Sequence, residues 1–92
     1  MTDSPDTDPP LLEFPCHFPI KAVGPATEVF EARVVEIVRT HAPNLGEGAV
    51  RCRASGGGKY LSVTVTVHAE SREQLDNIYL ALTACEEVMM VL

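Results

Sequence analysis

The stretch from Ser55 to Val67 decides the fold, and it reads SGGGKYLSVTVTV. From Tyr60 to about Ala69, aliphatic and polar side chains alternate. β-Branched residues at a period of two indicate a strand with one buried face. A register shift by one residue would expose its four aliphatic side chains, which are Leu61, Val63, Val65 and Val67. At roughly 1.5–3 kcal/mol each, the shift would cost about 6–12 kcal/mol, against a typical net stability of about 5–15 kcal/mol.

The three glycines before this strand could either cradle a phosphate or turn the chain between two strands. A phosphate-binding P-loop has the pattern Gly-x-x-x-x-Gly-Lys-Ser/Thr between a strand and a helix. Here Arg53 occupies the position of the first glycine and Tyr60 that of the final hydroxyl residue. A strand follows the glycines, so no helix N-terminus would face a phosphate. The glycines are therefore predicted to adopt positive φ in a β-hairpin.

Two elements are predicted before the hairpin strands. A first strand runs from Cys16 to Gly24, and the missing N–H of Pro19 must face solvent, a loop or an irregularity. Thr27 can cap a helix that continues to about His41, because apolar residues recur there at helical spacing.

Three further elements complete the pattern. A second strand is predicted from Ala49 to Ala54, immediately before the glycines. Ser71 and Gln74 form a capping-box pattern at the start of a second helix, with Gln74 reaching back. A final strand is predicted over residues 87–92, and it is apolar on both faces.

The resulting order is strand-helix-strand-strand-helix-strand, with one apolar stripe on each helix. The economical solution is an α+β two-layer sandwich with the ferredoxin-like βαββαβ arrangement. Right-handed crossovers then give a four-stranded antiparallel sheet of order 4-1-3-2, with both helices on one face. Residues 14–92 are predicted to form this single domain, and residues 1–13 a disordered acidic tail.

Charge divides unevenly along the 92 residues. The net charge is −6, but Asp3, Asp6, Asp8 and Glu13 supply four of the thirteen acidic groups, so the rest carries −2. Nucleic-acid binding requires a surface excess of Lys and Arg, and the balance of the whole chain argues against it. RNA-binding domains of this topology stack bases on aromatic residues of the central strands, where only Tyr60 is available. No nucleic-acid partner is expected.

The cysteines and the apolar runs exclude further classes. Cys16, Cys52 and Cys85 are odd in number and lack the spacing of a zinc or redox motif. We expect reduced thiols, no metal and no cofactor. The chain begins without the basic and apolar segments of a signal peptide, and no apolar run reaches the ~20 residues of a membrane span. A cytoplasmic protein without membrane contact is expected.

Four stretches in fixed order resemble the YbeD-like family of small bacterial proteins of unknown function. They are Leu12–Pro15, Phe18–Gly24, Ser55–Val63, and Ile78-Tyr79 together with the terminal Met-Val-Leu. The resemblance covers residues 13–92 and implies a ferredoxin-type sandwich similar to the ACT domains that regulate amino-acid enzymes. It implies a regulatory role and brings no catalytic residues.

Catalysis is not expected from the residues themselves. Cys16 and His17 are adjacent in a predicted strand, so their side chains point to opposite faces and do not form a nucleophile–base pair. His68 lacks an evident orienting partner, and Glu86 and Glu87 fit a solvated turn. We therefore expect a protein that is not an enzyme.

The sheet face away from the helices is the predicted contact surface for a protein partner. Together with the last strand, it gives a candidate partner face of Lys21, Arg51, Arg53, Tyr60, Thr64, Met89 and Val91. The chain would then act as a regulatory or adaptor module through protein–protein contacts.

The alternative is an ACT-like sensor that binds an amino acid or organic acid at the turn after the first strand. The ligand would meet Gly24, Pro25 and Thr27, where amides at the start of the first helix are expected to be free. By the same resemblance, a homodimer would be required to complete that site.

Overall fold

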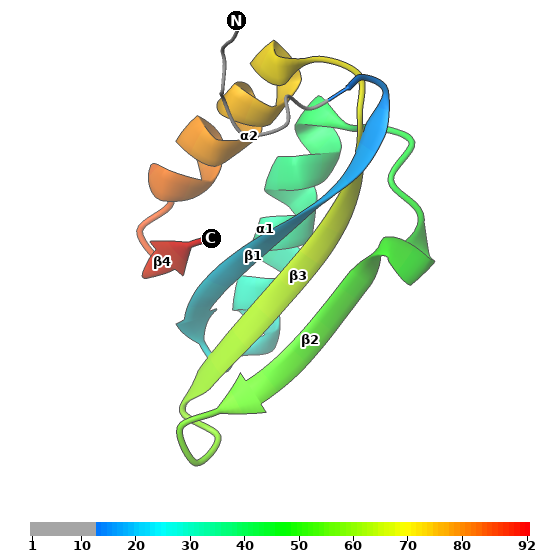
Figure 1. Cartoon of the computed structure of the whole chain (residues 1–92). Coiled ribbons are helices and arrows are strands. Elements are labelled where there is room, and N and C mark those ends of the chain that lie inside the picture. Colours follow the sequence, from blue (N-terminus) through cyan, green and yellow to red (C-terminus); the bar gives the residue numbers. More distant parts are fainter. Residues whose placement is uncertain (1–12) are drawn as a thin grey trace, which may run out of the picture.

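The structure of the chain is a computed structural model that describes residues 13–92. The predicted acidic tail lies outside this range except for Glu13. Seven elements follow in order: β1 (Cys16–Pro25), α1 (Glu28–His41), the short 3-10 helix η1 (Glu47–Ala49), β2 (Val50–Ser55), β3 (Tyr60–Ala69), α2 (Arg72–Thr83) and β4 (Met90–Val91). Figure 1 shows the two helices behind one face of the sheet.

The sheet confirms the predicted topology. Its strands lie in the order β2-β3-β1-β4, which is 4-1-3-2 read from the other edge, and all neighbouring pairs are antiparallel. β1 and β3 pair along their whole length, with Ile20 opposite Val65 and Ala22 opposite Val63. These opposed aliphatic residues define the inner face, which the helices cover.

The core lies between this inner face and the two helices. Val63, Val65 and Val67 of β3 are buried, which confirms the predicted register of the strand. The remaining buried apolar residues are Ile20, Ala22, Phe30, Val34, Val38, Ala42, Ala69, Leu75, Ile78 and Leu82. Sheet and helices therefore bury one apolar surface each, and the opposite face of the sheet is left to solvent.

Side chains cap both helices at their N-termini. The hydroxyl of Thr27 accepts a hydrogen bond from the Phe30 amide at 3.0 Å. The hydroxyl of Ser71 accepts one from the Gln74 amide at 3.1 Å. Gln74 does reach back, but its oxygen accepts from the amide of Glu70 rather than from that of Ser71. Its side-chain nitrogen donates to the carbonyl of His41 at 2.8 Å, so Gln74 links the end of α1 to the start of α2.

The glycines between β2 and β3 form the predicted hairpin loop. Gly56, Gly57 and Gly58 have φ values of 62°, 68° and 89°. Side chains with a Cβ are strained in this left-handed region, so glycine fits all three positions. The amide of Gly58 donates to the carbonyl of Ser55, which tightens the turn. The glycines therefore reverse the chain.

Boundaries of three predicted strands need correction. β1 ends at Pro25 instead of Gly24, and β2 ends at Ser55 instead of Ala54. The last strand spans only Met90–Val91 instead of residues 87–92, because the chain first passes through turns after α2. β2 begins at Val50 and not at Ala49, which closes η1. Neither described helix has the length and hydropathy that crossing a bilayer requires.

Candidate functional site

The outer face of the sheet gathers basic residues in two neighbouring rows across three strands. In one row, Thr64 of β3 lies between Lys21 of β1 and Arg51 of β2. In the next row, Ser62 lies between Val23 and Arg53. Directly opposed residues of antiparallel strands have Cβ atoms about 4.5–5.5 Å apart. We call Lys21, Arg51, Arg53, Ser62 and Thr64 the basic patch.

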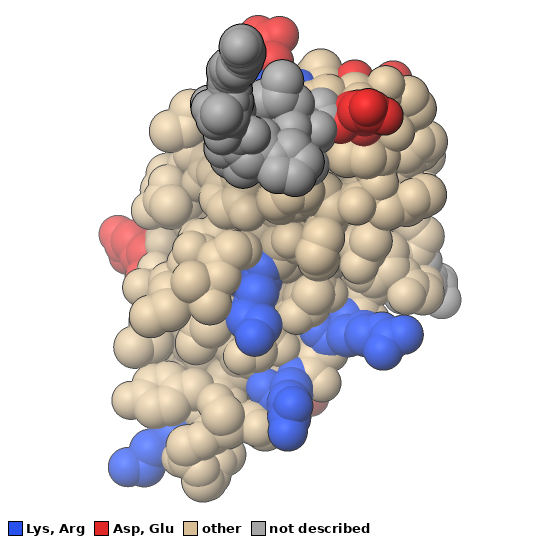
Figure 2. Space-filling model, in the orientation of Figure 1, with Lys and Arg blue, Asp and Glu red and all other residues tan. Residues whose placement is uncertain are grey.

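The basic patch is an exposed, concave surface without internal neutralisation. Its residues, together with Cys52, line a hollow of about 400 Å³. Among the side chains described within residues 13–92, no carboxylate forms an ion pair with Lys21, Arg51 or Arg53. Figure 2 shows the basic side chains gathered over the lower half of this face, while the acidic side chains lie mainly toward its top and left margin. An acidic group of a partner could approach the patch with little opposing charge.

The last strand borders the basic patch, but not through the residues predicted from the sequence. Val91 lies opposite Ala22 on the inner face and packs against the core, so its place on the partner face was wrong. Met90 lies opposite Val23 on the outer face and is 53% exposed. Leu92 exchanges two backbone hydrogen bonds with Lys21 and is 61% exposed. Met89 is also exposed, and its amide donates to the carbonyl of Val23.

Met90 and Leu92 are the outward-facing apolar residues that the sequence pattern missed. Because residues 88–92 are all apolar, alternation could not show which of them face outward. The pairing with β1 settles this, and it supplies an apolar margin beside Lys21.

Tyr60 and the histidine pair lie at opposite ends of the outer face. Tyr60 lies opposite Ser55 at the hairpin end, beyond the two rows of the basic patch. His17 and His68 lie opposite each other at the other end and stack, with ring centroids 4.9 Å apart. The three aromatic rings are thus not gathered on one platform.

The predicted ligand turn is largely occupied by its own chain. Gly24 is buried, with the ring of Phe30 and the carbonyl of Glu87 above its Cα. The amide of Ala26 donates to the carbonyl of Lys59, and that of Thr27 donates to the carbonyl of Pro25. The amides of Ala26 and Thr27 are therefore not free to bind an anion, while the expectation for the first amides of α1 itself stays a prediction.

The groups considered for catalysis are dispersed. Cys16 is half-buried on the inner side of β1, whereas His17 is exposed on the outer side. Glu87 lies 3.8 Å from the guanidinium of Arg33 and accepts a hydrogen bond from the Cys85 thiol. Within residues 13–92, no three His, Cys, Asp or Glu side chains are grouped so that they could hold a metal.

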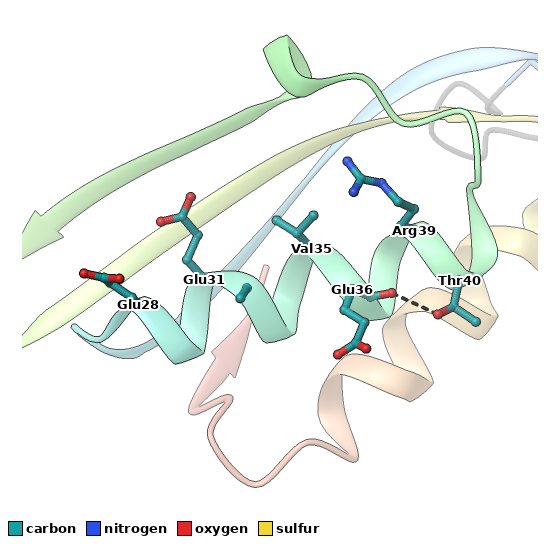
Figure 3. Close-up of a pocket in the computed structure, with 7 residues that line it drawn as sticks. Glu28, Glu31, Val35, Glu36, Arg39 and Thr40 are labelled. Atoms are coloured by element: carbon teal, nitrogen blue, oxygen red, sulfur yellow. Dashed lines mark hydrogen bonds between the residues drawn. The ribbon is translucent and has the colours of Figure 1, made fainter.

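A second hollow lies along the flank of α1 that faces β2. It has a volume of about 1000 Å³, and its lining includes Glu28, Glu31, Ala32, Val35, Glu36, Arg39 and Thr40. Figure 3 shows Glu31, Val35 and Arg39 projecting from the same side of the helix. The hydroxyl of Thr40 donates to the carbonyl of Glu36, one turn earlier.

The thiol of Cys52 connects this flank to β2. Partial burial raises the pKa of Cys52, and the Glu31 carboxylate raises it further by its negative charge and by a hydrogen bond. The thiol is therefore protonated at neutral pH. It contributes a small, uncharged group beside the α1 flank.

Comparison with known proteins places the chain in a family. Residues 9–92 match the family described as "Protein of unknown function (DUF493)". The chain belongs to the DUF493 family. Among similar members, a UPF0250 protein of Chromobacterium violaceum is 52% identical over 82 residues, which cover 89% of this chain and 92% of that protein. A UPF0250 protein of Pseudomonas paraeruginosa is 47% identical over the full length of both chains.

A solved structure supports the architecture. The solution structure of protein HP0495 from H. pylori superposes with a TM-score of 0.73, covering 100% of this chain and 98% of that chain. The sequence identity is 16%, so this similarity concerns the fold. Both the YbeD-like resemblance and the ferredoxin-like βαββαβ fold predicted from the sequence are confirmed.

Proposed function

We propose that this DUF493 protein is a regulatory or adaptor module of the cytoplasm, not an enzyme, which binds an acidic partner protein through the outer face of its sheet. The observation that carries the proposal is the basic patch. Lys21, Arg51 and Arg53 lie in adjacent rows of the sheet, and no described carboxylate forms an ion pair with them. Like charges so close together repel each other, and an acidic partner would relieve that repulsion.

The apolar margin supports a protein as the partner. Met90 and Leu92 expose more than half of their surface, and they pair with Val23 and Lys21 of β1, respectively. Full burial of such a side chain contributes roughly 1.5–3 kcal/mol, whereas an exposed ion pair contributes about 0.2–1 kcal/mol. An apolar contact flanked by charge pairs is typical of a protein interface, in which apolar groups supply affinity and charges supply orientation. Methionine is well suited to such an adaptable contact.

A charge-reversal variant tests the proposal. Arg51→Glu with Arg53→Glu should abolish capture of acidic proteins from an extract of the native bacterium, while circular dichroism shows an unchanged fold. Arg33→Glu with Arg72→Glu is the matched control, because it makes the same change in net charge at exposed helix positions away from β2. Mass spectrometry should identify proteins that are retained by the wild type and by the control but lost from the patch variant. Equal retention by all three forms would contradict the proposal.

The ACT-like sensor, and with it the homodimer, remains the alternative, and the turn geometry does not favour it. The amides of Ala26 and Thr27 already have backbone acceptors. A titration with amino acids and short organic acids, followed by NMR, should leave the amide resonances of Gly24 and Thr27 unshifted. A saturable shift of both would restore the sensor.

A further inference from the structure

β2 is an edge strand whose outer edge is open and whose inner side is largely exposed, with Glu31 of α1 bonded to the Cys52 thiol. In the sheet it neighbours only β3. All of its residues except the half-buried Val50 are exposed, including Cys52 and Ala54, which lie opposite the core-facing Val63 and Leu61. Figure 1 shows β2 at the margin of the sheet, with the helices behind the other strands. The described part of the chain thus leaves room for a further strand beside β2.

The hydrogen-bonding pattern identifies the backbone groups at this free edge. The amide of Ala26 donates to Lys59, and the amide of Lys21 donates to Leu92. In an antiparallel sheet, the backbone N–H and C=O groups of successive residues point toward opposite neighbouring strands. Odd-numbered residues of β3 therefore hydrogen-bond to β1, and even-numbered residues hydrogen-bond to β2. Arg51 and Arg53 therefore bond to β3. The amides and carbonyls of Cys52 and Ala54 point away from the sheet.

The two sides of this edge require different side chains from an added strand. On the outer side, every second residue of the added strand would lie beside Arg51 or Arg53. Carboxylates at these positions would form favourable cross-strand pairs with the two arginines. On the inner side, the intervening residues would lie beside Cys52 and Ala54. The α1 flank there carries Glu28, Glu31 and Glu36 beside Ala32 and Val35, and Glu31 bonds to the Cys52 thiol, so an added carboxylate would be repelled on this side. Small apolar side chains fit there. A segment that alternates acidic and small apolar residues is complementary to both sides.

Charge also disfavours a second copy of this chain in the two registers that use the middle of β2. A symmetric antiparallel pair of β2 strands centred on Cys52 would place Arg51 opposite Arg53 of the second copy. A pair centred on Arg53 would place that arginine opposite its own copy. Like charges that are directly opposed destabilise a strand pair. An acidic segment of another protein has no such conflict.

We propose that the open edge of β2 accepts an extended acidic segment of a partner protein as a fifth strand of the sheet. Main-chain hydrogen bonds to Cys52 and Ala54 supply affinity, and carboxylates beside Arg51 and Arg53 set the register. The inference rests on the proposed function, because it states how the same acidic partner is held. Edge strands commonly carry charged residues to discourage pairing, and the experiment below distinguishes that role from recruitment.

A synthetic peptide tests the inference on the full chain. The probe is an eight-residue peptide in which glutamate alternates with valine, labelled for fluorescence anisotropy. In antiparallel pairing its valine amides face β2. A version methylated on the valine nitrogens keeps every charge but loses these donors. The first peptide should bind and slow the hydrogen exchange of the Cys52 and Ala54 amides by about tenfold or more, and the methylated peptide should bind at least tenfold more weakly.

Protein variants separate the backbone contribution from the charge. Cys52→Pro removes an edge amide without removing a hydrogen bond to β3, and proline is tolerated at such edge positions. It should weaken peptide binding about tenfold, whereas Cys52→Ala, which keeps the amide, should bind like the wild type. The methylated peptide makes the same test on the unchanged protein, so a misfolded Cys52→Pro does not decide the outcome.

Each remaining outcome has a defined meaning. If Arg51→Glu with Arg53→Glu loses binding but Cys52→Pro and the methylated peptide bind normally, strand addition is overturned and the proposed function stands. If the charge-reversal variant also binds normally, both fail. If the Cys52 and Ala54 amides are protected in the full chain without peptide, its own chain or a second copy occupies the edge. That result would also overturn the inference.

Discussion

Replacing Gly24 with alanine should destabilise the protein, because a methyl group at this position has no space. A Cβ there would lie 2.5 Å from Cζ of Phe30 and 2.6 Å from the carbonyl oxygen of Glu87. Both distances are far inside van der Waals contact. Phe30 is completely buried and cannot swing its ring into solvent, and the carbonyl belongs to the backbone. β1 would have to move away from α1 and from the turn before β4.

The expected loss combines two opposing terms. Overpacking a core costs about 1–3 kcal/mol, and two obstructions that cannot yield place this site at the upper end. The substitution also adds about 0.5–1 kcal/mol to the free energy of unfolding, because glycine loses more backbone freedom on folding than alanine does. We therefore expect a net loss of about 2 kcal/mol in the free energy of unfolding. For a domain of this size the melting temperature would fall by roughly 8–16 °C.

Urea denaturation monitored by circular dichroism measures this loss. Gly46→Ala is the matched control, because a Cβ at Gly46 has no atom within 4 Å. Its stability should stay within about 0.5 kcal/mol of the wild type. Phe30→Leu should recover part of the loss in the Gly24→Ala background, since a smaller side chain frees space beneath the new methyl group. Equal stability of Gly24→Ala and Gly46→Ala would refute the packing explanation.

Two other predictions concern a helix cap and a thiol. Ser71→Ala should lower the free energy of unfolding by about 1 kcal/mol because the α2 cap is lost, whereas Ser71→Asp should keep the cap. Identical urea midpoints for the two variants would contradict this prediction. Because the pKa of Cys52 is raised, its alkylation by iodoacetamide should accelerate only at a pH above the ordinary thiol midpoint. The contribution of Cys52 to the free energy of unfolding should fall as the pH rises from the pKa of the unfolded state to that of the folded state. Glu31→Gln should move the alkylation midpoint downward only part of the way, since burial is the larger cause, and an unchanged midpoint would exclude the contact with Glu31.

Local patterns were sufficient to predict most of the architecture. The alternation in β3 predicted both its span and its buried face, because a half-buried strand must place every second residue in the core. Thr27 and Ser71 predicted both helix starts, because the capping hydrogen bond forms within four residues of the chain. The basic patch was also predictable, since alternation in two strands assigns Lys21, Arg51 and Arg53 to one face.

Features that depend on contacts between distant segments were not predictable in this way. The sequence showed Gly24 only as the end of the first strand, and its position beneath Phe30 shows that it is required for close packing. Gln74 resembled half of a capping box, but it also bonds to His41, 33 residues earlier.

The alternation of side chains and the capping residues, both local properties of the chain, were enough to specify the four strands, the two helices and the charge of the outer face. The sequence could not show that Met90, not Val91, faces outward, since a strand that is apolar on both sides takes its register from its neighbour β1. Nor could it show that the inner side of β2 is largely exposed, because the placement of α1 across the sheet depends on how the whole core packs.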